Sequence, residues 1–197
     1  AIMRDCIRKK RLSFSGSIKD AAKKATVIFI AVGTPSKSTG DADLVYVENV
    51  ARQIAENMDS YRLIVEKSTV PAETGNKIRR TIELNLPKKF RKGGQVLLGF
   101  DVASNPEFLK EGSAVHDFMN PDRIVVGVES ARARKIMEEL YAPFKAPLLM
   151  TDIRSAEIIK HASNAFLATK ISFINAVSHL AEAVGADINM IAKGIGL

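Results

Sequence analysis

The chain has 197 residues, of which 46% are hydrophobic and 26% charged, and it carries a formal net charge of +7. This length and balance are typical of a globular protein with one sizeable core, or with one domain and part of another. They argue against a membrane protein, because no apolar run reaches the ~18 residues that a spanning helix needs. The lone cysteine, Cys6, cannot form an internal disulfide, so a reducing cytoplasm is the expected location.

The apolar pattern of the first 150 residues switches repeatedly between strand-like runs and helical spacing. Short runs rich in β-branched residues predict strands at 25–32, 62–65, 100–104, 123–128 and 147–150. Apolar residues at helical spacing predict helices at 44–58, 74–84 and 131–141. This alternation predicts an α/β fold with a doubly wound parallel sheet.

Polar turn motifs follow three of the predicted strands. They are Gly33-Thr34-Pro35, Ser68-Thr69-Val70-Pro71 and Asn105-Pro106-Glu107. Ligands of doubly wound sheets bind beyond the carboxyl ends of the strands. The three turns are therefore the expected place for a binding site.

Residues 152–184 contain neither proline nor glycine and are apolar on most faces. At ~1.5 Å per residue they predict a helix of about 50 Å. A helix this apolar needs cover on several sides, which suggests a homodimer interface. Gly185 would end the helix, and Asp187 could cap a following one.

A dinucleotide-binding fold normally opens with a strand and a G-x-G-x-x-G turn at a helix N-terminus. The sequence contains no such turn, since Gly194-Ile195-Gly196 follows a predicted helix rather than a strand. Either the cofactor is not a dinucleotide, or the first βαβ unit lies upstream of Ala1. A chain that begins on alanine favours the second explanation.

Four segments contain a specific combination of motifs. They are VIFIAVGTPSK (27–37), VEKSTVPAET (65–74), ASNPEFLKEGSAVHDFMNPDRIVVG (103–127) and SAEIIKHASNAFLATKISFINAVSHLAEAVGADI (155–188). Together and in this order they resemble the UDP-glucose/GDP-mannose dehydrogenase family. The pair NPEFLKEG and NPDRIVVG points to the UDP-glucose 6-dehydrogenase branch, with GDP-mannose 6-dehydrogenase as the alternative.

The resemblance implies two Rossmann-like domains joined by a long central helix. Residues 1–150 would be the C-terminal part of the NAD-binding domain, and residues 151–197 would begin the central helical dimerisation domain. The implied activity is the NAD-dependent four-electron oxidation of UDP-glucose to UDP-glucuronate. The chain itself would be an internal segment of such an enzyme, acting as a homodimer or higher oligomer.

The same resemblance assigns roles to individual residues. NAD would lie beside Val32, Gly33, Thr34, Pro35, Ser68, Thr69, Val70 and Glu111. The substrate would contact Glu107, Phe108, Leu109, Lys110, Glu111, Lys160 and Asn164. The expected catalytic residues are Thr69, Glu107, Glu111, Lys160 and Asn164, and no metal is expected.

The chemistry of these side chains agrees with the implied roles. Glu107 and Glu111 are four residues apart, so a helical turn would place both carboxylates on one face. Two close carboxylates push their pKa values apart, so that one can act as an acid and the other as a base. Lys160 and Asn164 have the same spacing and could stabilise a developing oxyanion.

The second oxidation step needs a reactive cysteine. In the family this cysteine lies in a glycine-rich motif beyond the central helix, and no such motif occurs in the sequence. Cys6 lies at the opposite end, in a basic stretch that matches no family motif. The isolated chain is therefore expected to lack dehydrogenase activity.

Two further classes of function remain open at this stage. A non-catalytic nucleotide-sugar-binding or dimerisation module would suit the long apolar helix. Nucleic-acid binding through the basic clusters at 4–11 and 88–92 is the weaker alternative, because no nucleic-acid-binding motif accompanies them. Arg123 could pair with an anionic group or with a neighbouring acid, and it has no assigned role.

Overall fold

The structure is a computed structural model that describes residues 2–196. The chain forms two compact units, Ala1–Glu157 and Ile158–Leu197, and each is described by itself.

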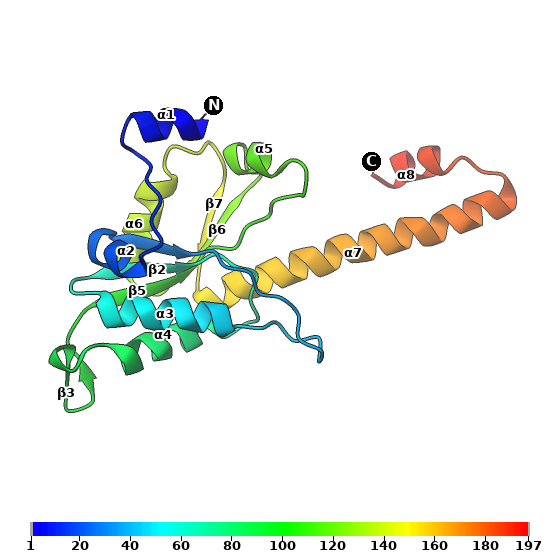
Figure 1. Ribbon diagram of the computed structural model, residues 1–197. Helices are drawn as coiled ribbons and strands as arrows, with labels where there is room; N and C mark the ends of the chain where they lie inside the picture. The colour runs from blue at the N-terminus through cyan, green and yellow to red at the C-terminus, as the bar shows by residue number, and fades with distance from the viewer. Residues whose placement is uncertain (1, 197) are drawn as a thin grey trace. The chain divides into compact units, whose positions relative to one another are not determined.

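The first unit is built on a five-stranded sheet in the order β1-β2-β5-β6-β7 (Figure 1). Its strands are β1 (Val27–Ile30), β2 (Arg62–Glu66), β5 (Phe100–Ser104), β6 (Ile124–Val128) and β7 (Leu148–Thr151). The connecting helices are α3 (Val45–Asn57), α4 (Thr74–Asn85), α5 (Ala114–Met119) and α6 (Ala131–Tyr141), preceded by α1 (Ile2–Arg8) and α2 (Ile18–Lys24). The strands and helices predicted between residues 25 and 150 are confirmed, with ends shifted by at most two residues.

The sheet is parallel except between β5 and β6. That antiparallel pairing is short and joins Ala103 to Val128 and Ser104 to Gly127. A parallel pairing of β5 and β6 would need a crossover connection that runs back from the end of β5 to the level of its start. The segment between β5 and β6 contains only the six-residue helix α5, so β6 starts at the edge where β5 ends. Strand–helix alternation could not predict this reversal.

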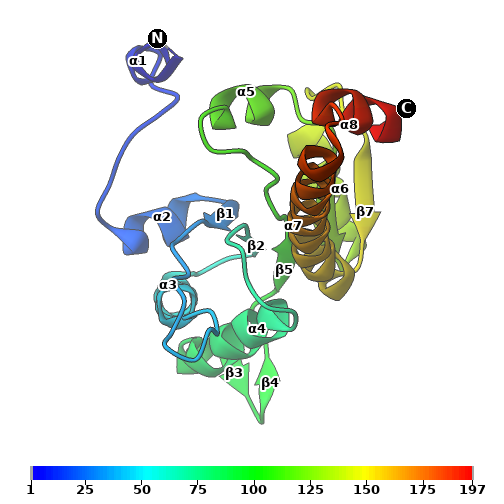
Figure 2. The same ribbon diagram turned by 90° about the vertical axis from the view of Figure 1, so that its right-hand side faces the viewer.

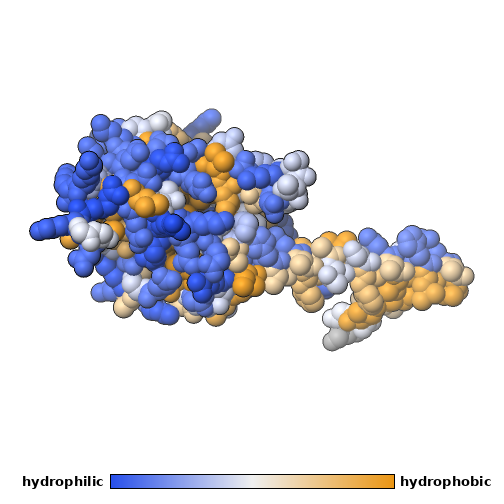
Figure 3. Space-filling model, turned by 90° about the horizontal axis from the view of Figure 1, so that it is seen from below, coloured by the Kyte–Doolittle hydropathy of each residue, from blue (hydrophilic) through white to orange (hydrophobic). Residues whose placement is uncertain are grey.

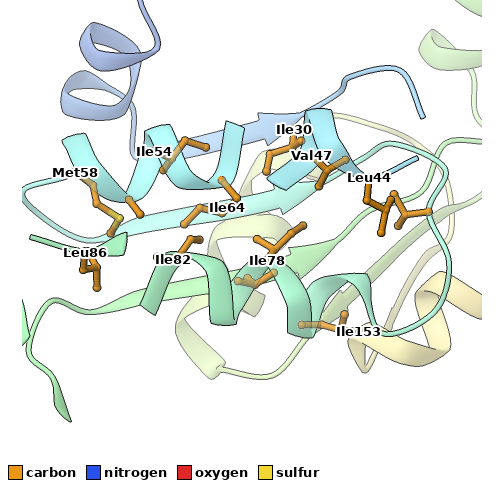
Figure 4. Packing of buried hydrophobic residues seen from close by; sticks show 14 residues of the cluster. Ile30, Leu44, Val47, Ile54, Met58, Ile64, Ile78, Ile82, Leu86 and Ile153 are labelled. Carbon is orange, nitrogen blue, oxygen red and sulfur yellow. The ribbon is translucent and has the colours of Figure 1, made fainter. Parts of the chain in front are cut away.

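The two faces of the sheet bury separate apolar clusters. Alternation along β2 directs Ile64 towards α3 and α4, and Leu63 and Val65 towards α6. Figure 2 shows these helices on opposite sides of the sheet. In the first cluster, drawn in Figure 4, Ile153 from the start of α7 packs with residues of α3 and α4.

A short hairpin extends from the end of α4. It begins with the 3-10 turn η1 (Lys88–Phe90) and pairs β3 (Arg91–Lys92) with β4 (Gln95–Val96). Gly93 and Gly94 both have positive φ, +57° and +82°, as a tight hairpin turn requires. The basic cluster at 88–92 therefore lies on a largely exposed hairpin.

Helix α7 (Ile153–Val184) begins in the first unit and supplies most of the second. Gly185, at φ +69°, ends it, and α8 (Ile188–Gly196) follows. Large apolar side chains stay exposed along both helices, and Figure 3 shows them as orange patches. They include Phe166, Leu167, Ile171, Phe173, Leu180, Val184 and Met190. No helix within residues 2–196 is both long and apolar enough to cross a membrane.

Candidate functional site

The turns that follow β1 and β2 are joined to each other by hydrogen bonds. The Ser68 hydroxyl accepts a hydrogen bond from the Val32 amide at 3.0 Å and donates to the Val32 carbonyl at 2.8 Å. The Thr34 hydroxyl donates to the Thr69 carbonyl at 2.8 Å. Because β1 and β2 are parallel neighbours, their carboxyl ends meet at one edge of the sheet. The structure thus brings together the two turns that the sequence singled out.

The remaining residues of these turns divide between core and surface. Val70 is buried in the cluster under α3 and α4. Gly33 and Pro35 are exposed. A Cβ added to Gly33 would meet no atom within 4 Å, so space is open beside its backbone. This open backbone fits a dinucleotide lying across the carboxyl ends of the parallel strands.

The position of the third turn is fixed by hydrogen bonds of Asn105, a residue for which no role was predicted. Its amide nitrogen Nδ2 donates to the Val125 carbonyl at 2.8 Å, and its backbone N–H donates to the Glu66 carbonyl at 2.8 Å. Its Oδ1 accepts hydrogen bonds from the Tyr141 hydroxyl and from Lys67 Nζ. Asn105 is 1% exposed, so this buried network fixes the point where the 107–111 segment begins.

The prediction that a helical turn carries Glu107 and Glu111 is wrong. Residues 105–110 have no regular secondary structure, and the next helix, α5, begins only at Ala114. The Glu107 carboxylate instead accepts a hydrogen bond from the Leu109 amide at 2.7 Å. Gly112 has φ +86°, a conformation that ends any helical path before α5.

Asp117, on α5, stabilises the loop from residue 107 to residue 113 by hydrogen bonds to two of its residues. Its carboxylate accepts hydrogen bonds from the Lys110 amide at 3.0 Å and the Ser113 hydroxyl at 2.8 Å. These bonds lower the pKa of Asp117, the Lys110 amide having the largest effect. Leu109, Lys110 and Glu111 are exposed on this loop.

Phe108 and Arg123 lie against each other in the same region. The Arg123 guanidinium carbon is 4.2 Å from the centre of the Phe108 ring, a cation–π contact. Arg123 directly precedes β6, which starts at the edge where β5 ends. A role for Arg123 in shaping the 107–111 segment was not predicted.

Two glutamates of the first unit, Glu66 and Glu157, are buried. Glu66, the last residue of β2, is 1% exposed, and Glu157, near the start of α7, is 2% exposed. Glu157 accepts hydrogen bonds from the backbone amides of Glu73 and Gly75, at 2.8 and 2.7 Å. The signal in the sequence for Glu66 was a glutamate that directly follows the apolar run 63–65, since carboxylates are rarely buried.

The second unit contains the two predicted residues Lys160 and Asn164, on α7. Lys160 is 7% exposed, whereas Asn164 is exposed. Their spacing of four residues places both on one face of the helix, as predicted. Their approach to the reacting atoms stays a prediction. Within residues 2–196, no group of three or more histidine, cysteine or acidic side chains could hold a metal ion.

Known proteins resemble this chain over nearly its whole length. Residues 1–145 match the NAD-binding domain of the UDP-glucose/GDP-mannose dehydrogenase family, and residues 154–197 match the family's central domain. The UDP-glucose 6-dehydrogenase TuaD of Bacillus subtilis is 48% identical over 188 residues, which are 95% of this chain and 39% of that protein.

Two solved structures share the fold. A UDP-glucose dehydrogenase from Pyrobaculum islandicum superimposes with a TM-score of 0.88 at 41% identity, over 98% of this chain and 44% of that one. A GDP-mannose dehydrogenase from Pseudomonas aeruginosa has the same TM-score and coverage at 33% identity.

The match to an NAD-binding domain confirms NAD as the expected cofactor, and the Rossmann-like fold class is confirmed as well. The chain spans about two fifths of the length of the curated relatives that it matches. Both family domains are matched in order, over well more than half of the chain. The chain belongs to the UDP-glucose/GDP-mannose dehydrogenase family.

Proposed function

We propose that this chain forms part of an NAD-dependent UDP-glucose 6-dehydrogenase, which oxidises the C6 hydroxyl of UDP-glucose to a carboxylate. The observation that carries the proposal is the pair of mutually fastened turns, 32–35 and 68–70, in a domain that matches an NAD-binding domain. Relatives named UDP-glucose 6-dehydrogenase are 41–48% identical to the chain. A cytoplasmic location and a division of the chain near residue 150 belong to the same proposal.

The cofactor site in this proposal is the edge formed by these turns. Val32, Gly33, Thr34 and Pro35 contact one part of NAD, and Ser68, Thr69 and Val70 another. Two of these side chains, Thr34 and Ser68, already use their hydroxyls to join the turns. They therefore act by shaping the backbone that faces the cofactor, while the exposed Gly33 lets a ligand approach closely. Glu111 would reach the cofactor from the 107–113 loop, which follows the third turn.

The proposal assigns substrate roles to the 107–111 segment of the first unit and, separately, to Lys160 and Asn164 of the second unit. NAD+, held by the turns at 32–35 and 68–70, would supply the acceptor for the hydride from C6. Glu107 or Glu111, or a water held by one of them with Thr69, takes the proton of the C6 hydroxyl. Lys160 and Asn164 stabilise the negative charge that develops on that oxygen, an effect worth ~3 kcal/mol per donor in the transition state. Phe108, Leu109 and Lys110 complete the surface along which the sugar lies.

GDP-mannose oxidation is the rival within the family. The Pseudomonas GDP-mannose dehydrogenase shares the fold but is 33% identical, against 41% for the Pyrobaculum UDP-glucose dehydrogenase. The higher identity supports UDP-glucose. An exchange experiment distinguishes UDP-glucose from GDP-mannose as the substrate. In it, this chain replaces the matching segment of each type of enzyme. We expect activity to be retained in a UDP-glucose dehydrogenase and lost in a GDP-mannose dehydrogenase.

A homodimer is part of the proposed function. The support is the row of exposed apolar side chains on α7 and α8, such as Phe166 at 67% and Val184 at 70% exposure. An apolar surface of this extent normally marks a protein–protein interface. A second copy of the chain is the occupant that we propose, because the surface belongs to the long helix of the central domain.

The proposed roles are tested in a chimera that carries residues 1–197 in place of the matching segment of the Bacillus enzyme. Lys160→Met keeps the length of the side chain but removes its charge, and we expect kcat with UDP-glucose to fall about 100-fold or more. Lys170→Ala, at an exposed position of the same helix, is the matched control and should leave kcat unchanged. Circular dichroism confirms that each variant is folded. A folded Lys160→Met chimera with the parent kcat would refute the assigned role.

A further inference from the structure

Lys67 is a charged residue at the carboxyl end of β2 that has no role in the proposed reaction. It directly precedes the 68–70 turn and is half-buried. Its Nζ donates hydrogen bonds to both oxygens of Asn105, at 3.2 Å to Oδ1 and at 3.3 Å to the backbone carbonyl. One ammonium group thus contacts the residue that fixes the position of the third turn.

The strand order places this contact between the two parts of the candidate site. β2 lies between β1 and β5, and both pairings are parallel, so the three carboxyl ends meet at one edge of the sheet (Figure 1). The turn that follows β2 is therefore the middle one of the three. Its residues can reach the turn on either side.

Adjacent residues of the middle turn bond to different neighbours. Ser68, through its hydroxyl, and Thr69, through its carbonyl, bond to the turn that follows β1. The side chain of Lys67, one residue earlier, bonds to Asn105 in the turn that follows β5. A stretch of three residues therefore links the turns proposed to bind NAD with the start of the segment proposed to bind substrate.

The contact to the Asn105 carbonyl acts on the peptide group where the chain leaves the sheet. The backbone N–H of Asn105 still bonds to the Glu66 carbonyl, as a further residue of the strand would. The next peptide group, between Asn105 and Pro106, has no N–H, so it accepts hydrogen bonds but donates none. Because a peptide group is planar, the direction of its carbonyl also sets the direction of the following chain. Lys67 binds this carbonyl and so acts on the path into residues 107–111.

Asn105 gives Lys67 a rigid partner. Its Nδ2 donates to the Val125 carbonyl at 2.8 Å, which turns Oδ1 towards Lys67 and the Tyr141 hydroxyl. The residue is 1% exposed, so its side chain has little room to rearrange. Hydrogen bonds to a charged donor are stronger than those between neutral groups. The ammonium group therefore has a definite orienting effect on both oxygens.

We propose that Lys67 is a positioning residue, which sets the direction of the 105–107 backbone relative to the turns at 32–35 and 68–70. Its significance for catalysis rests on the proposed function, in which it aligns the 107–111 segment with the cofactor. The positioning itself does not depend on that function.

Loss of Lys67 should affect the two parts of the site unequally. The hydroxyls of Ser68 and Thr34 still join the first two turns, so the cofactor side keeps its geometry. The Asn105 carbonyl loses its charged partner, so the substrate side does not. Misplaced reacting groups slow a reaction even where binding is preserved. The expected signature is a lower kcat with an almost unchanged KM for NAD.

The first test is amide hydrogen exchange of the 197-residue chain, followed by NMR without cofactor. Lys67→Met keeps the length of the side chain and removes its charge and its donors. The amides of Leu109 and Lys110, which bond to the carboxylates of Glu107 and Asp117, report on the substrate side. We expect both amides to exchange about tenfold faster in Lys67→Met than in the parent chain.

A reporter on the cofactor side and a matched variant serve as controls. The Val32 amide, which bonds to the Ser68 hydroxyl, should change by less than about twofold in the same variant. Lys77→Met, at an exposed position of α4, should leave all of these exchange rates unchanged. Unchanged exchange at Leu109 and Lys110 would overturn the proposal. Equal acceleration of these two amides and of Val32 would also overturn it, because that pattern reports only a general loss of stability.

The second test is kinetic and uses the chimera with the Bacillus enzyme. Lys67→Met should lower kcat with UDP-glucose about tenfold and change the KM for NAD by less than about twofold. Lys77→Met should change neither constant. A raised KM for NAD with the parent kcat would contradict the positioning role, because it would place Lys67 in cofactor binding. An inactive parent chimera would contradict the proposed function, and the exchange rates would still decide on the positioning.

A second substitution covers the case in which Lys67→Met does not fold, as judged by circular dichroism. Lys67→Arg keeps the charge but carries it on a longer, planar group, so the Asn105 carbonyl should be drawn into a different orientation. We expect the amide signals of Leu109 and Lys110 to shift and that of Val32 to stay in place. Unshifted signals at Leu109 and Lys110 would then overturn the proposal.

Discussion

At the scale of single residues, the geometry of the candidate site is determined by buried polar side chains more than by the residues that would face a ligand. Asn105 illustrates this, because its side chain joins β6, α6 and the residue that follows β2. Its neighbour Pro106 leads directly into the segment proposed to bind substrate. The position of that segment is thus decided by a residue that makes no proposed contact with substrate.

Asn105→Ala should destabilise the fold markedly. The substitution leaves the Val125 carbonyl and the Tyr141 hydroxyl buried without this partner, and each such loss costs about 1–3 kcal/mol. We expect the free energy of unfolding, measured by urea denaturation, to fall by roughly 3 kcal/mol. Asn57→Ala, which removes an exposed bond to the Gln53 carbonyl, should cost well under ~1 kcal/mol. Equal losses for the two variants would refute the importance of the Asn105 network.

The sequence predicted some of these residues and could not have predicted others. The turn motifs after β1 and β2 were recognisable because short polar turns follow continuous apolar strands. The fastening of Val32 to Ser68 depends on strand register, which no local pattern encodes. Asp117 was missed for a similar reason, since its carboxylate accepts a hydrogen bond from the backbone of Lys110, seven residues earlier in the chain.

At the scale of elements, the spacing of apolar residues predicted the helices and strands correctly but gave a wrong prediction for the loop before α5. The helices α3, α4 and α6 each bury one apolar face, and this is what a helical period reports. In the 107–113 loop, Glu107 and Glu111 are spaced as on a helical turn, but the backbone between them is not helical. Pro106 removes a backbone donor and Gly112 adopts a positive φ, so the local backbone rather than the spacing decides.

The junction between β6 and α7 is a second place where backbone geometry decides. A Cβ on Gly127 would lie 2.6 Å from the Asp152 carbonyl oxygen and 2.7 Å from Ile153 Cα. Both are backbone atoms that cannot move aside without displacing α7 from the sheet. Gly127→Ala should therefore lower the free energy of unfolding by roughly 3 kcal/mol or more, as overpacking does. Gly16→Ala, where a Cβ meets nothing within 4 Å, should be nearly neutral, and a neutral Gly127→Ala would contradict the described packing.

The exposed apolar side chains of α7 and α8 lead to a prediction about the oligomeric state of the chain. If their exposed apolar side chains form a homodimer interface, light scattering of the chain should give twice its mass of 21.5 kDa. Phe173→Lys together with Leu180→Lys should shift the protein to the monomer, because buried lysines are not tolerated in such an interface. Leu84→Lys, at an equally exposed apolar site on α4, should leave the dimer intact. A monomeric parent chain would rule out the interface.

At the scale of the whole molecule, the chain combines a five-stranded sheet in the part that matches an NAD-binding domain with helices in the part that matches the family's central domain. Both were recognisable in the sequence from four ordered motifs, and both are matched by the family's domains. Relatives are more than twice as long as the chain, so the proposed reaction needs residues that the chain does not supply. The isolated 197-residue chain is accordingly expected to form no NADH from UDP-glucose.

We propose that this chain supplies part of the cofactor site and the acid–base and oxyanion groups of a UDP-glucose dehydrogenase. The most direct measurement is NADH formation by the chimera in which the chain replaces the matching segment of the Bacillus enzyme, to which it is 48% identical. We expect two NADH for each UDP-glucose consumed, as the proposed four-electron oxidation requires. A folded chimera that binds UDP-glucose but forms no NADH would contradict it.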